Sequence, residues 1–226
     1  MLYLPVCLSL ALVAGLSAPI SARDDKPLAT NVVIYPNEGL AVADKTDSYI
    51  PAQTRVAVLP AVDRTGERAE NRRQAQAKAV YENMIEQFTK SGFVVVPQAE
   101  VNAAISEAGM DLNDEEAYRR DNFIAVAGAV NADLVIFAAV TDASQGTKSG
   151  VFNAGEKEGK ARVKFWLLDA KKKKAIYSAV IKEGKAGGAS KLFATNEGSN
   201  RQINAAGNAV KELLEPFLKP YAPAKK

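Results

Sequence analysis

The chain has 226 residues, 47% of them hydrophobic, a formal net charge of +3 and no histidine. The absence of histidine excludes a Ser-His-Asp triad, a histidine general base and histidine-ligated zinc or haem. The small net charge does not fit a strongly basic nucleic-acid binder, so we predict no nucleic-acid partner. The length suits one well-buried core, and no linker rich in Gly, Ser or Pro divides the chain.

Residues 1–22 have the pattern of a signal peptide. They carry no charged side chain, and the apolar stretch Leu8–Leu16 is too short for a stop-transfer helix. Small residues follow, and the polar chain begins at Arg23, so we predict cleavage between Ala22 and Arg23. No Lys or Arg precedes the apolar stretch, which leaves a buried N-terminal helix or an uncleaved anchor as alternatives. We expect an exported protein, either periplasmic or associated with the outer membrane.

Cys7 is the single cysteine, and it lies inside this leader. Removing the leader therefore leaves no disulfide, no cysteine nucleophile and no cysteine metal site. A lipid-attachment cysteine would follow a small residue at the end of the apolar stretch. Here Val6 precedes the cysteine and the apolar stretch comes after it, which argues against a lipoprotein.

The mature chain is expected to have three parts. Residues 23–54 form an N-terminal extension with a possible short strand at 31–35, residues 55–221 form the folded domain, and 222–226 form a C-terminal tail. Within the domain, apolar runs, helical periodicity and caps predict the elements of its first half. These are a strand at 55–62, a helix at 71–90, a strand at 93–96, a helix at 99–108 and a helix at 114–127.

The second half of the domain reads as a meander followed by a helix. The continuous apolar run Leu134–Val140 is typical of a strand covered on both faces. Strands at 161–169 and 175–183 flank a hairpin turn at Lys171–Lys174, and a helix follows at 201–218. Gly- and Lys-rich segments at 142–160 and 184–200 are expected to be loops. The predicted fold class is a single α/β domain, with a mixed sheet, the order β-α-β-α-α-β-β-β-α, and helices packed on the sheet.

No group of residues has the pattern of a catalytic or cofactor site. The Lys171–Lys174 run is better explained as a solvated hairpin tip than as an anion-binding patch. The acids 114–116 suit the first turn of a helix, where the helix dipole favours negative charge. The segment 155–160 lacks the glycine spacing of a phosphate loop. We therefore predict no enzyme activity, no catalytic residues, no metal and no cofactor.

The turn after the first strand is the one candidate interaction site. It consists of Asp63, Arg64, Thr65 and Gly66. In one interpretation, Asp63 and Thr65 satisfy backbone groups within the turn. In the other, the turn contacts a second subunit or a partner protein.

Two motifs resemble the CsgG family. V-A-V-L-P-x-x-D-R-T-G-E at Val56–Glu67 precedes a long helix, and G-F-x-V-V-P follows at Gly92–Pro97. This combination resembles the periplasmic domain of CsgG-type curli-secretion proteins, and it is also similar to the amino-terminal domain of TolB-like proteins. The segments 128–137 and 163–178 extend the resemblance, which covers about residues 55–219.

The resemblance implies a non-enzymatic module of the cell envelope. Channel members of the family form rings of side-by-side domains, so we expect the turn at 55–67 and one sheet edge to meet a neighbour. They also carry long amphipathic hairpins, which the glycine-broken segments 142–160 and 184–200 do not resemble, so we expect no pore and at most peripheral membrane contact. The expected partners are a second copy or an envelope or secretion protein. The alternative function is a periplasmic ligand-binding protein or a carboxylate-based hydrolase.

Overall fold

The structure is a computed structural model that describes residues 32–33, 49–147, 157–188 and 197–221. The predicted signal peptide 1–22, its cleavage site at Ala22 and Arg23, most of the extension 23–54 and the tail 222–226 lie outside the described residues.

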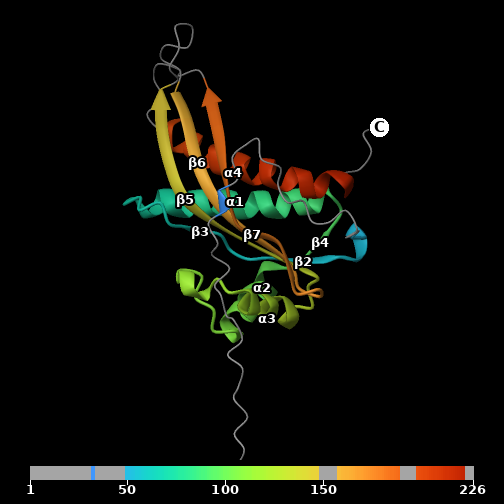
Figure 1. The fold of residues 1–226 in the computed structure, drawn as a ribbon. Helices are drawn as coiled ribbons and strands as arrows, with labels where there is room; N and C mark the ends of the chain where they lie inside the picture. Colours follow the sequence, from blue (N-terminus) through green and yellow to red (C-terminus); the bar gives the residue numbers. More distant parts are fainter. Residues whose placement is uncertain (1–31, 34–48, 148–156, 189–196, 222–226) are drawn as a thin grey trace, which may run out of the picture.

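One mixed sheet organises the domain (Figure 1). The described residues form seven strands, of which six follow the order β1-β7-β6-β5-β2-β4, while β3 pairs with β5. Strands β5, β6 and β7 are antiparallel neighbours, whereas β1, β2, β3 and β4 pair in parallel. The strands are β1 (Val32–Val33), β2 (Arg55–Val58), β3 (Val62–Asp63), β4 (Val94–Val95), β5 (Leu134–Thr147), β6 (Lys157–Asp169) and β7 (Lys174–Gly188).

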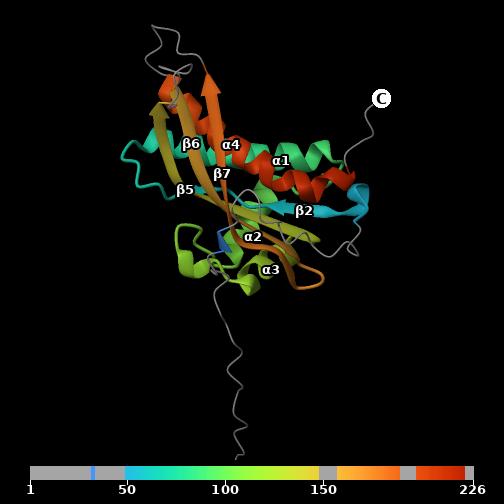
Figure 2. The same cartoon turned by 45° about the horizontal axis from the view of Figure 1, so that its top comes forward.

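Helices cover both faces of the sheet, which gives three layers (Figures 1 and 2). The two long helices α1 (Glu70–Lys90) and α4 (Glu197–Leu218) lie on one face, and α2 (Gln98–Glu107) and α3 (Arg120–Ala129) lie on the other. Three short 3-10 turns complete the order: η1 (Pro51–Gln53), η2 (Glu115–Ala117) and η3 (Lys219–Tyr221). The predicted α/β fold class and element order are thus confirmed.

Each face of the sheet has its own hydrophobic core. On the α1 and α4 side, alternate residues of β5 and β6 pack against Met84 and Phe88 of α1 and Leu213 of α4. On the α2 and α3 side, the intervening strand residues pack against Val101 of α2 and Phe123 of α3. Because β5 is buried on both faces, its apolar run has no polar alternation. The prediction that 134–140 is an interior strand covered on both faces is confirmed.

The predicted loops at 142–160 and 184–200 are wrong in part. β5 continues to Thr147, β6 begins at Lys157 and β7 continues to Gly188, so the three strands extend together beyond the rest of the sheet (Figure 1). Gly159 and Gly184 face α4, because an added Cβ would lie 2.5 Å from the Arg201 carbonyl oxygen and 2.0 Å from the Ala205 carbonyl oxygen, respectively. Small residues therefore allow close helix packing here. The expectation of no pore was based on irregular chain in these two segments, and the strands found there remove that argument.

The predicted helix at 114–127 is also wrong in part. The Asp114 side chain accepts a hydrogen bond from the Glu116 amide, which closes the short turn η2 rather than a long helix. The α-helix begins only at Arg120. The first strand is shorter than predicted as well, since β2 ends at Val58 and Val62–Asp63 forms the separate strand β3.

Within the described residues, no helix has the length and hydrophobicity required to cross a membrane.

Candidate interaction site around the Asp63–Gly66 turn

The turn is closed by the side chain of its first residue. Asp63 Oδ1 accepts hydrogen bonds from the Thr65 amide at 2.9 Å and from the Thr65 hydroxyl at 2.6 Å. Gly66 has a φ of 72°, a backbone conformation that residues with a Cβ rarely adopt. The Arg64 amide donates to the Val140 carbonyl at 2.7 Å, which fixes the turn to the edge of β5. The interpretation of Asp63 and Thr65 as turn-forming residues is confirmed.

Arg64 leaves the turn and joins it to the segment around η2. Its Nη2 donates to the Asn113 carbonyl at 2.5 Å, and its guanidinium carbon lies 5.0 Å above the centre of the Tyr118 ring. Its Nη1 lies 3.7 Å from Glu115 Oε2. A hydrogen bond, a cation–π contact and an ion pair thus hold one side chain in place.

A second cation approaches the same carboxylate from the sheet. Lys164 of β6 is 7% exposed, and its Nζ lies 3.5 Å from Glu115 Oε1 and 5.3 Å from the centre of the Trp166 ring. Glu115 therefore bridges two cations, with one oxygen toward each. We call Arg64, Glu115, Lys164, Tyr118 and Trp166 the Arg64–Lys164 cluster.

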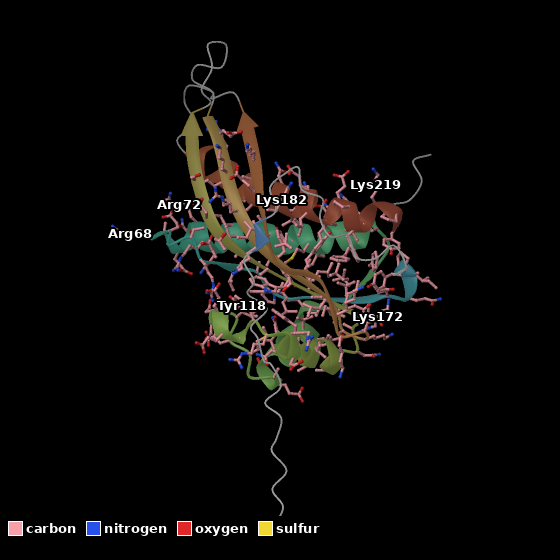
Figure 3. The ribbon with its side chains drawn as sticks, in the orientation of Figure 1. Arg68, Arg72, Tyr118, Lys172, Lys182 and Lys219 are labelled. Atoms are coloured by element: carbon pink, nitrogen blue, oxygen red, sulfur yellow. The ribbon has the colours of Figure 1, made fainter. Side chains whose placement is uncertain are left out.

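Two aromatic rings form the base of this cluster. The Tyr118 and Trp166 ring centres are 5.1 Å apart, and both rings are almost fully buried. The Tyr118 hydroxyl donates to the Leu112 carbonyl at 2.5 Å, and burial raises the pKa of Tyr118 to about 12. Figure 3 shows Tyr118 on the side of the molecule where α1 begins, marked by Arg68 and Arg72, away from Lys172 at the other end. Trp166 therefore packs inside the domain.

The other polar candidates have local structural roles. In the Lys171–Lys174 turn, Lys171 pairs with Asp133, and Lys172 lies 3.7 Å from Asp169. Glu115 and Glu116 belong to the short turn that Asp114 caps. Sequence patterns did not identify Lys164 as a member of a cluster, because its partner Glu115 lies 49 residues away in the chain. Tyr118 was missed because its partner Arg64 belongs to a distant turn.

The ionisation of Asp63 gives a testable pH dependence. Burial is the largest cause and raises the pKa of Asp63 above its ordinary value of 3.8, while its bonds from Thr65 act in the opposite direction. A raised folded-state pKa means that this carboxyl favours folding most below pH 3.8, and that the contribution is lost as the pH rises through the folded-state pKa.

Asp63→Asn should therefore stabilise the folded chain at neutral pH, by less than about 1 kcal/mol because the group is only partly buried. The gain should vanish well below pH 3.8, where the Asp63 carboxyl is protonated in both the folded and the unfolded chain. Urea unfolding of both proteins at several pH values measures it. Asp63→Ala is the control, since alanine removes the turn hydrogen bonds and should destabilise at every pH. A constant difference between Asp63→Asn and the parent protein would contradict the prediction.

A pocket of about 430 Å³ lies between α1, the end of β7 and α4. Asn83 Nδ2 donates to the Ala79 carbonyl at 2.7 Å, and Asn208 Nδ2 donates to the Lys185 carbonyl at 2.8 Å. The pocket is lined by Ala79, Asn83, Lys185, Ala186, Gly187, Ile203, Asn204, Gly207, Asn208 and Lys211. This lining contains lysines and asparagine amides but no carboxylate. In the part of the chain that the structure describes, no group of three or more His, Cys, Asp or Glu residues could hold a metal ion.

Comparison with known proteins gives structural similarity only. No protein-family model matches the sequence, and no curated protein matches it. A hypothetical protein from Chlamydia trachomatis, CT253, is 15% identical with a TM-score of 0.49, over 77% of this chain and all of that one. The lipoprotein GNA1162 from Neisseria meningitidis is 16% identical with a TM-score of 0.42, over 70% of this chain and 99% of that one.

The PelC dodecamer from Paraburkholderia phytofirmans is a third similar structure. It is 16% identical with a TM-score of 0.38, over 75% of this chain and 92% of that one. Similarity at this level carries no inference about function, which we draw from the contacts and surfaces of the chain itself.

Proposed function

We propose that the chain is a non-enzymatic assembly or interaction module of the bacterial cell envelope, similar to the periplasmic domain of CsgG-type secretion proteins. The leader pattern at 1–22 supports export, and the motifs at Val56–Glu67 and Gly92–Pro97 support the family. The partner in this proposal is a second copy of the chain or another envelope protein.

The observation that carries the proposal is the pair of open edges on the extended strands. Among the described residues, β5 pairs beyond Val140 only with β6, and β7 pairs beyond Ile181 only with β6. An open strand edge presents unpaired backbone N–H and C=O groups to an incoming strand. Because the β5 edge continues directly from the Asp63–Gly66 turn, both expected contact regions lie along one side of the domain.

The two faces of this extension favour a protein partner and no pore. One face is covered by α4, which approaches Gly159 and Gly184 closely. The other carries the ion pair Arg162–Glu183 at 3.3 Å and the ion pair Lys185–Glu183 at 3.8 Å. A surface with this much charge is costly to place in lipid, so the proposal limits membrane contact to the periphery.

A periplasmic ligand-binding protein is the second candidate, and the pocket beside Asn83 favours it over a hydrolase. Asn83 Oδ1 is buried without a hydrogen-bond partner among the described residues, so a bound donor would satisfy it. The lining has no pair of carboxylates for acid–base hydrolysis.

The mass of the leaderless protein in solution tests the proposal. Light scattering, with and without detergent, is expected to give a mass greater than that of one chain. This mass should decrease when the protein is diluted. A strict monomer at high concentration in both conditions, with no partner recovered by crosslinking in cells, would contradict the proposal.

A further inference from the structure

We infer that the Arg64–Lys164 cluster is a binding site for an acidic side chain of a partner protein, and that the chain's own Glu115 occupies it in the free protein. This inference rests on the proposed function, since it names the chemistry of the partner that the turn would contact. It concerns the side of the domain where the Asp63–Gly66 turn meets η2.

The two cations are held in place without Glu115. The Arg64 backbone is bonded to Val140, its side chain donates to the Asn113 carbonyl, and its guanidinium lies over Tyr118. Lys164 extends from the central strand β6 and is almost fully buried against Trp166. A buried ammonium group requires a negative partner, so these positions favour a carboxylate between them.

Glu115, in contrast, is held weakly. Its side chain is 56% exposed, and its oxygens lie 3.5 Å from Lys164 Nζ and 3.7 Å from Arg64 Nη1, longer than charge-assisted hydrogen bonds. It belongs to a 3-10 turn of three residues. Because the Glu115 end of both ion pairs is exposed to water, we expect each pair to change an equilibrium constant by only about fivefold, so a carboxylate from outside can replace it.

The cluster also has unused hydrogen-bond donors. Arg64 Nε and Trp166 Nε1 are buried and have no hydrogen-bond partner among the described residues. Each is a donor, so both require an acceptor. A carboxylate has two oxygens with about four acceptor positions, and it is the ligand whose charge and geometry suit an arginine beside a lysine. An acidic side chain from a partner can therefore satisfy the two cations in the way that Glu115 does.

Trp166 is the only tryptophan of the chain, so its fluorescence reports on the cluster directly. The probe is an acetylated, amidated tetraglutamate peptide, titrated at low ionic strength into the leaderless protein. The peptide is expected to shift the emission of the parent protein. It should bind about fivefold more tightly to Glu115→Gln, because the internal competitor has been removed. Arg64→Gln should abolish the shift.

Three comparisons make the experiment specific. Glu116→Gln is the matched control, since Glu116 is an exposed neighbour with no contact to Arg64 or Lys164, and its affinity should equal that of the parent. A tetraglutamine peptide should give no shift. If Glu115→Gln does not fold, as checked by circular dichroism, the parent protein must still respond to tetraglutamate, and Arg64→Gln and Lys164→Met must lose the response.

Three results would overturn the inference. The first is a parent protein that does not respond to tetraglutamate, and the second is a response that is unchanged in Arg64→Gln. The third is an emission shift caused by phosphatidylglycerol vesicles and not by the peptide, which would assign the cluster to a membrane surface. Light scattering distinguishes a failure of this inference from a failure of the proposed function. If the protein assembles but does not bind the peptide, only the inference of an acidic partner is contradicted.

Discussion

Replacing Gly184 with alanine is expected to destabilise the folded chain by about 3 kcal/mol, at the upper end of the cost of overpacking. A Cβ at this position would lie 2.0 Å from the Ala205 carbonyl oxygen and 2.4 Å from the Ala209 amide nitrogen. Both atoms belong to the backbone of α4, so relief requires the whole helix to move away from β7. Because α4 supplies a large share of one core, that movement also exposes apolar side chains.

Urea unfolding followed by circular dichroism measures this effect. Gly128→Ala is the matched control, because Gly128 lies in α3 and an added Cβ there would meet no atom within 4 Å. That substitution should stabilise the protein by about 0.5–1 kcal/mol, the helix-propensity difference between the two residues. Equal effects of the two substitutions would show that α4 does not pack against Gly184 as described.

Replacing Trp166 with alanine should cost about 3–5 kcal/mol, the usual range for emptying a buried aromatic site. Trp166 is 1% exposed and contacts Tyr118 and Phe137, with ring centres 5.1 and 5.4 Å away. Its loss leaves a cavity below Lys164 and removes the ring that lies under the ammonium group. Thermal unfolding followed by circular dichroism is the appropriate measurement, since the substitution removes the only tryptophan.

Trp166→Phe separates packing from hydrogen bonding. Trp166 Nε1 has no hydrogen-bond partner among the described residues, so phenylalanine loses volume but no hydrogen bond. The expected cost is only about 1–2 kcal/mol. A cost for Trp166→Phe as large as that for Trp166→Ala would mean that the indole N–H has a partner in solution.

Periodicity predicted most of the fold because most elements bury one clear face. The helix predicted at 71–90 occurs at Glu70–Lys90. The helix predicted at 201–218 is α4 (Glu197–Leu218), which begins about one turn earlier than predicted. The antiparallel meander followed from the apolar run at Leu134–Val140 and the alternation in the next strand. These patterns reflect burial against the sheet, which local sequence records well.

The errors arose where a local sequence signal has a structural role other than the one predicted from it. Glycines in 142–160 and 184–200 suggested loops, but Gly159 and Gly184 lie in strands whose small residues admit α4. The acids at 114–116 suggested the start of a long helix, but Asp114 closes only η2. In both cases the residue choice depends on an element or turn geometry that sequence spacing does not reveal.

The candidate site was predictable in part for the same reason. The hydrogen bonds from Thr65 to Asp63 join near neighbours, so turn chemistry predicted them. Arg64 meets Glu115 and Tyr118 only because β3 pairs with β5 and η2 lies beside it. Nothing in the pattern around Arg64 indicates these contacts, which depend on the tertiary fold.

Disulfide trapping between two copies tests the central claim, assembly through the open edges of β5 and β7, most directly. The leaderless chain has no cysteine, so Ser144→Cys on β5 and Lys185→Cys on β7 introduce the only thiols in their respective variants. Ser144 and Lys185 occupy the same row across the sheet, since both pair with Lys160. If a neighbouring copy continues the sheet, mixing the two variants under mild oxidation should give a disulfide-linked dimer, whereas Ser106→Cys on α2 should remain monomeric. If neither the mixture nor Lys185→Cys alone forms more dimer than Ser106→Cys, the account of assembly through these edges is contradicted.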